Sequence, residues 1–67
     1  MRYIVESSER GYINQVRWDD DMGGILDVCY TFSKIMRRTF TAKQLRIVKQ
    51  YCAYYEIDIT ITETAED

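Results

Sequence analysis

The sequence predicts a small α+β domain, in which a three-stranded, mostly antiparallel sheet carries two helices on one face. Three patterns indicate this fold. Thr41 and Gln44 have the spacing of a capping box, which marks the start of a helix. Isoleucines at positions 57, 59 and 61 alternate with polar residues, as in a strand with one buried face. Near the N-terminus, two apolar runs flank a turn-forming segment. With a further helix over residues 25–38, the expected element order is β-β-α-α-β.

The N-terminal part predicts a hairpin. Residues 2–7 (RYIVES) and 12–18 (YINQVRW) have strand composition, and the Ser-Ser-Glu-Arg-Gly segment between them suits a turn. Apolar residues on both faces of the first run favour a central strand. In the second run, strict alternation places Val16 on one face and Ile13 on the other.

Residues 25–38 (ILDVCYTFSKIMRR) fit two patterns. The strand pattern alternates from Leu26 to Phe32 and stops at Ser33. The helical pattern continues through Arg38, and its last residues are mostly good helix formers, so we favour a helix. The helix would bury an apolar stripe made of Ile25, Val28, Cys29, Phe32, Ile35 and Met36.

The capped helix is predicted over residues 42–55. Its narrow apolar stripe consists of Leu45, Val48, Cys52 and Tyr55. A helix on a small sheet needs no wider stripe, so the neighbouring Ile47, Tyr51 and Tyr54 are surplus. They cover the other helix or meet a partner.

Length and composition indicate one domain over residues 1–67. A chain of this size buries only about 60% of its unfolded surface, so oligomerisation or a partner would add stability. Cys29 and Cys52 lie among apolar neighbours, and we expect buried free thiols in a reducing cytoplasm, with a bridge between them left open. No stretch is apolar enough for a signal peptide or membrane span, so we expect a cytoplasmic protein without a membrane partner.

Basic residues concentrate in the middle of the chain, where residues 34–50 contain no acid. They are candidates for binding the phosphates of a nucleic acid: Lys34, Arg37, Arg38, Lys43, Arg46 and Lys49. The commoner explanation is a solvated helix face, and the acidic pI of about 5.0 argues against non-specific DNA binding as the main role.

Acidic residues form a second candidate surface, which would imitate a phosphate backbone and occupy the basic channel of a nucleic-acid enzyme. Its members are Asp19, Asp20, Asp21, Asp58, Glu63, Glu66 and Asp67. The three consecutive aspartates offer oxygen ligands for Mg²⁺ or Ca²⁺, but neighbours in a loop rarely converge on one ion. We expect them to end a strand and cap the next helix, and we expect no metal.

Catalytic chemistry has little support in this sequence. The chain has no histidine to act as a base near neutral pH, and no partner that would activate a serine is evident. Tyr30 and Lys34 have the spacing of a reductase acid pair, but no dinucleotide-binding glycine motif accompanies them. We therefore expect a protein that is not an enzyme and binds no cofactor.

The segments GYINQVRWDDD, FTAKQLRIVKQYC and YEIDITITE, in this order, resemble the architecture of small accessory proteins encoded by bacteriophages and prophages. Many such proteins, anti-CRISPR proteins among them, bind and inhibit a host defence protein. The resemblance covers much of the chain but carries over no site residue.

We therefore expect a non-catalytic protein-binding module that inhibits a bacterial nucleic-acid-handling or defence complex in the host cytoplasm. The partner-binding candidates are Asp19, Asp20, Asp21, Ile47, Tyr51 and Tyr54. A homodimer through the surplus helix residues is compatible with this function. The alternative is a small nucleic-acid-binding regulator that uses the basic residues named above.

Overall fold

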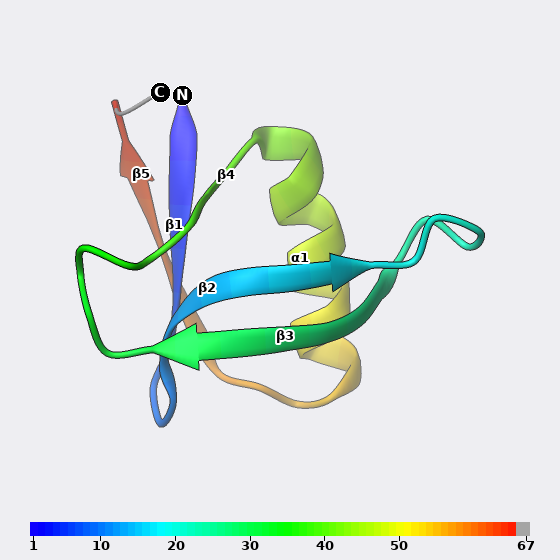
Figure 1. Ribbon diagram of the computed structural model, residues 1–67, viewed down its shortest axis with the longest axis horizontal. Coiled ribbons are helices and arrows are strands. Elements are labelled where there is room, and N and C mark those ends of the chain that lie inside the picture. The colour runs from blue at the N-terminus through cyan, green and yellow to red at the C-terminus, as the bar shows by residue number, and fades with distance from the viewer. Residues whose placement is uncertain (66–67) are drawn as a thin grey trace.

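The computed structural model describes residues 1–65 and confirms the α+β class (Figure 1). The elements follow in the order β1 (Arg2–Ser7), β2 (Gly11–Trp18), β3 (Ile25–Thr31), β4 (Thr39–Phe40), α1 (Ala42–Tyr54) and β5 (Ile59–Thr64). The expected three strands and two helices are wrong in number. Within the described residues, five antiparallel strands form one sheet and a single helix packs against it.

Strand β1 is the centre of the sheet, as predicted. It pairs with β5 along its whole length, from Arg2 opposite Thr64 to Ser7 opposite Ile59. On its other side, β1 pairs with β2 at one end and with the short β4 at the other. Strand β2 continues beyond β1 to pair with β3. Figure 1 shows that these two strands extend transversely to β1 and β5 and pass in front of α1.

The segment 25–38 is not a helix. Its first half forms β3, which pairs with β2 and directs Val28 and Tyr30 to the core. β-Branched and aromatic residues in this half suit a strand. Pairing with β2 provides hydrogen-bond partners for the backbone of β3, and a pattern within residues 25–38 alone cannot predict this pairing. Residues 32–38 form a loop. The predicted helical stripe is therefore divided between a strand and an exposed segment.

An irregularity in β2 also departs from the predicted alternation. The pairing with β3 shifts register between Ile13 and Gln15, which is the signature of a β-bulge. The extra residue lets Ile13 and Val16, which strict alternation puts on opposite faces, both enter the core.

Helix α1 begins where the capping box predicts. The Gln44 backbone N–H donates to Thr41 Oγ1 (3.2 Å), and the Thr41 N–H donates to Gln44 Oε1 (3.0 Å). The helix ends at Tyr54, one residue earlier than predicted, because Glu56 turns the chain with a left-handed φ of 57°. The N–H groups of Glu56 and Ile57 then donate back to carbonyls of the last turn, which is a Schellman-type cap.

The core lies between α1 and the sheet. Its fully buried side chains come from three strands and the helix: Val5, Ile13, Phe40, Val48 and Cys52. The isoleucines 57, 59 and 61 pack against this core, so the predicted half-buried strand is confirmed, although β5 begins only at Ile59 and Ile57 precedes it. Both cysteines are free thiols. Only Cys52 is buried, however, because Cys29 lies on the outer face of β3, so the expectation that both are buried is wrong for Cys29.

Candidate partner-binding surface

The acidic loop, residues 19–24, joins β2 to β3. Asp19 shapes it: its Oδ1 accepts hydrogen bonds from the N–H groups of Asp21 (3.0 Å) and Met22 (3.2 Å). Backbone bonds between Asp19 and the two glycines close the turn. Asp20 and Asp21 are exposed, so their carboxylates are available to a partner. The predicted strand-ending turn is thus confirmed, but the predicted helix cap is wrong because a strand follows.

The C-terminal end of α1 carries three clustered tyrosines. The rings of Tyr51 and Tyr55 lie 4.8 Å apart between centroids, and those of Tyr54 and Tyr55 lie 4.9 Å apart at nearly a right angle. Tyr54 is 80% exposed, whereas Tyr51 is half-buried and packs against the core. Tyr55, which the sequence pattern assigned to the buried stripe, is exposed because the helix ends before it.

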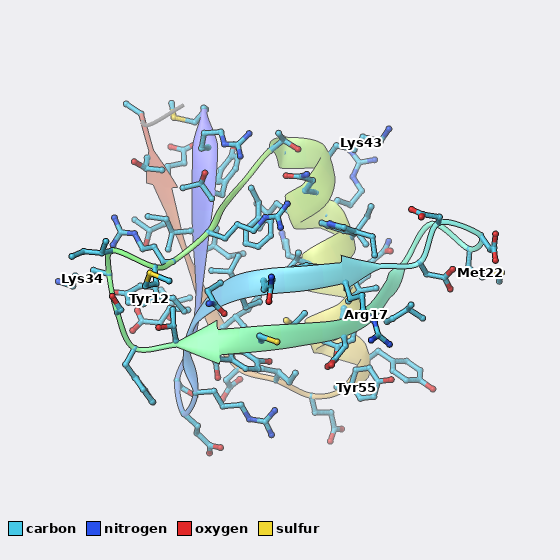
Figure 2. All side chains as sticks on the ribbon, viewed as in Figure 1. Tyr12, Arg17, Met22, Lys34, Lys43 and Tyr55 are labelled. Carbon is cyan, nitrogen blue, oxygen red and sulfur yellow. The ribbon has the colours of Figure 1, made fainter. Side chains whose placement is uncertain are left out.

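A shallow depression of about 260 Å³ connects these two features. Its wall combines the last residue of the acidic loop with the start of β3 and the end of the helix: Gly24, Ile25, Ile47, Gln50, Tyr51, Tyr54 and Tyr55. The structure thus brings the predicted Ile47, Tyr51 and Tyr54 to the base of the acidic loop. Figure 2 shows Met22, at the tip of this loop, and Tyr55 on the same side of the molecule. We call this the acidic–aromatic surface.

The half-buried Tyr51 phenol of this region is held in its neutral form. Burial, followed by the neighbouring Tyr30 and Tyr55, raises the pKa of Tyr51 above its ordinary value of 10.0. Burial also raises the pKa of Tyr30, although the Arg10 guanidinium, 5.6 Å from the ring centroid, opposes this effect. The surface therefore combines the neutral Tyr51 phenol with the carboxylates of the adjoining loop.

The other predicted acidic residues do not extend this surface as a group. Asp58 is exposed and lines a small polar depression next to Tyr55. Glu63 is exposed near the far end of β5, where it is paired with Tyr3 of β1. Glu66 and Asp67 lie outside the described residues.

The predicted basic residues fall into two groups. Lys34, Arg37 and Arg38 lie in the loop after β3, whereas Lys43, Arg46 and Lys49 are exposed on α1. Figure 2 places Lys34 and Lys43 on opposite sides of the molecule. The side chains therefore do not form one continuous stripe.

The candidate acid pair Tyr30 and Lys34 and the candidate metal ligands do not form a site in the structure. Tyr30 packs against the core from β3, whereas Lys34 is exposed in the loop, and the helical spacing that suggested an acid pair is absent. Within residues 1–65, no three side chains of the metal-ligating types gather at one point. Over the same residues, no helix has the length and apolar character needed to cross a membrane.

Comparisons with known proteins give no match to this chain among family models, curated proteins or solved structures. Its function is therefore argued from the geometry of the surfaces described above.

Proposed function

We propose that this protein is a non-catalytic protein-binding module whose acidic–aromatic surface engages a basic partner protein. The observation that supports the proposal most is the depression in which Tyr51, Tyr54 and Tyr55 adjoin the base of the acidic loop. Tyrosines are enriched among the residues that dominate binding energy at interfaces. Carboxylates at the edge of such a site accelerate association with a positively charged protein and exclude negatively charged ones.

The partner that fits this surface best is a protein with a basic, nucleic-acid-binding channel. Exposed carboxylates at Asp20 and Asp21 would occupy positions that phosphates otherwise take, while the tyrosines supply apolar anchoring. Such binding excludes the nucleic acid, so the protein would act as an inhibitor of a bacterial nucleic-acid-handling or defence complex, as the resemblance to phage-encoded accessory proteins implies. We place this action in the cytoplasm of the bacterial host.

A pull-down from bacterial lysate, with and without nuclease, tests the proposal. We expect a protein partner that is retained at near-stoichiometric amounts after nuclease treatment. The isolated partner should then bind the Tyr54→Ala variant about 30-fold more weakly than the native chain, because the variant lacks a strong interface anchor. Phe32→Ala is the matched control, since Phe32 (78% exposed) is as accessible as Tyr54 but lies in the loop after β3, outside the acidic–aromatic surface.

The charge part of the proposal has its own variant. Reversing Asp20 and Asp21 to lysine should slow association and reduce its salt dependence, whereas Glu63→Lys should have little effect. These two aspartates are preferable to Asp19, whose carboxylate builds the turn. Unchanged affinity in both the tyrosine and the aspartate variants would overturn the proposal.

Loss of all retained material on nuclease treatment would favour the alternative, a nucleic-acid-binding regulator. That alternative requires neutral variants of Arg38 and Arg46 to weaken binding and predicts a steep fall of affinity with salt. It has less support, because the two residues belong to separate basic groups.

A further inference from the structure

The loop after β3 exposes three large apolar side chains. Phe32, Ile35 and Met36 are 78%, 93% and 63% exposed, and the helix predicted for this segment would have buried all three. Soluble domains rarely place several large apolar groups together on a protruding segment without a binding role. We call residues 32–38 the basic loop, because all of its charged side chains are positive.

The charge of this loop is uniform. Lys34 lies between the exposed apolar residues, and Arg37 and Arg38 follow them. No acidic residue occurs between positions 28 and 55. The two guanidinium groups are held over aromatic rings, Arg37 at 5.5 Å from the Tyr12 centroid and Arg38 at 5.6 Å from that of Phe40. Positive charge is therefore held in place at the C-terminal end of the loop, next in sequence to the apolar side chains.

Local hydrogen bonds give the loop a defined shape. The Ser33 N–H donates to Thr31 Oγ1 (3.1 Å), and the Met36 N–H donates to Ser33 Oγ (3.4 Å). The Arg38 N–H donates to the Ile13 carbonyl of β2 (3.2 Å), which ties the end of the loop to the sheet. The loop is thus a preformed protrusion, so little ordering is needed before it binds.

We propose that the basic loop binds the surface of an anionic lipid bilayer. Phe32, Ile35 and Met36 enter the boundary between headgroups and acyl chains, while Lys34, Arg37 and Arg38 lie among the lipid phosphates. A loop that exposes both large apolar side chains and cations matches the two layers of such a surface. A nucleic acid offers the phosphates but no apolar layer, and a second copy of the same loop would bring like charges together.

This proposal is independent of the acidic–aromatic surface, which lies at the other end of β3. It also differs from the expectation of no membrane partner, which rested on the lack of an apolar stretch long enough to cross a bilayer. Peripheral binding through a loop requires no such stretch.

Co-sedimentation of the full chain with lipid vesicles tests the proposal. We expect binding to vesicles of phosphatidylcholine mixed with phosphatidylserine, little binding to phosphatidylcholine alone, and a decrease as salt is raised. Ile35→Ser should weaken binding about tenfold, since it removes one inserted apolar side chain. Lys34→Gln should weaken it about fivefold, the contribution of one basic residue near an anionic surface.

Met22→Ser is the matched control for the apolar residue. Met22 is 83% exposed, but it lies at the tip of the acidic loop, so vesicle binding should not change. Because Ile35 and Met22 are both exposed, neither substitution should unfold the domain, which circular dichroism would verify.

Four outcomes would overturn the proposal. The first is no sedimentation with either vesicle, and the second is equal sedimentation of the native chain and Ile35→Ser. The third is a chain that binds a fluorescent oligonucleotide but no vesicles, with the oligonucleotide binding weakened by Ile35→Ser. This result would assign the loop to a nucleic acid. The fourth is a concentration-dependent dimer, seen by sedimentation velocity and lost in Ile35→Ser, which would assign the apolar tip to a second copy.

Discussion

The two loops at the ends of β3 differ in both charge and apolar exposure. The acidic loop carries three aspartates and one exposed apolar side chain, Met22. The basic loop carries three cations and three exposed apolar side chains. Figure 2 places Met22 and Lys34, which mark the two loops, at opposite ends of the molecule. One short strand therefore separates two surfaces that suit different partners.

The loops are also stabilised differently. In the acidic loop, the Asp19 carboxylate accepts backbone N–H groups, so an acidic side chain itself forms the turn. In the basic loop, hydroxyl groups of Thr31 and Ser33 accept the backbone hydrogen bonds, and the two arginines stack on the rings of Tyr12 and Phe40. Because the two sets of contacts share no residue, substitutions in one loop should leave binding through the other unchanged.

The largest expected effect comes from the core that both loops share. Phe40, in β4, is fully buried in the core with Val48 and Cys52 of α1, and Arg38 of the basic loop stacks on its ring. We expect Phe40→Ala to lower the free energy of unfolding by about 3–5 kcal/mol, which is comparable to the total stability of a domain this small. Urea denaturation followed by circular dichroism would measure this loss.

Phe32→Ala serves as the control for that substitution, because it removes the same side chain from an exposed position. Its free energy of unfolding should stay within about 0.5 kcal/mol of the native value. If Phe40→Ala lowered the free energy of unfolding as little as Phe32→Ala, the burial of Phe40 in the core would be contradicted. Binding through both surfaces should fail together in Phe40→Ala, in contrast to the loop variants.

Two glycines with positive φ allow a finer comparison of the loops. Gly11, with φ of 87°, lies beside the start of the basic loop, and a Cβ added there would be 2.5 Å from the Thr31 carbonyl oxygen and 2.9 Å from the Phe32 ring. Gly23, with φ of 73°, lies in the acidic loop, where an added Cβ meets nothing within 4 Å. Both substitutions by alanine cause backbone strain, but only the first also causes a steric clash.

We therefore expect Gly11→Ala to cost about 2–3 kcal/mol and Gly23→Ala about 1 kcal/mol, measured by urea denaturation. Gly11→Ala should also weaken vesicle binding, because relieving the clash displaces Thr31 and Phe32. Gly23→Ala should not affect vesicle binding. Equal losses of stability in the two variants would mean that the close approach of Gly11 to β3 is absent.

The success of sequence-based prediction differed between segments for a physical reason. The start of α1 and the pattern of β5 were predictable because their signals are local: Thr41 and Gln44 are three residues apart, and the isoleucines alternate. Residues 25–38 satisfied a helical and a strand pattern at once. Pairing with β2, a contact between segments distant in sequence, decided between them.

The same distinction applies to the candidate surfaces. Tyr54 was predictable as a surface residue, because it lies outside the narrow apolar stripe of α1 that the sheet can cover. Tyr55 was missed, since its exposure depends on the left-handed turn at Glu56, a position that usually favours glycine. The apolar tip of the basic loop was hidden by the helix assignment, which counted Phe32, Ile35 and Met36 as buried.

The smallest expected effect is a pH dependence of stability in the alkaline range. The raised pKa of Tyr51 means that the folded state favours the neutral phenol more than the unfolded state does. This contribution to stability is fully present below the unfolded value of 10.0 and is lost as pH rises through the raised folded value. Tyr30 adds a change of the same sign, and Cys52, whose thiol pKa is raised by burial, adds another that begins near 9.0.

Urea denaturation across this alkaline range should therefore show stability falling with pH, and Tyr51→Phe should reduce the slope. Tyrosinate absorbance provides the direct measurement: subtracting the titration of Tyr51→Phe from that of the native chain isolates the Tyr51 phenol. The same titration in concentrated urea is the control, because the unfolded phenol should ionise at its ordinary pKa. If Tyr51 ionised at the same pH in the folded and unfolded chains, its packing against the core beside Tyr30 and Tyr55 would be contradicted.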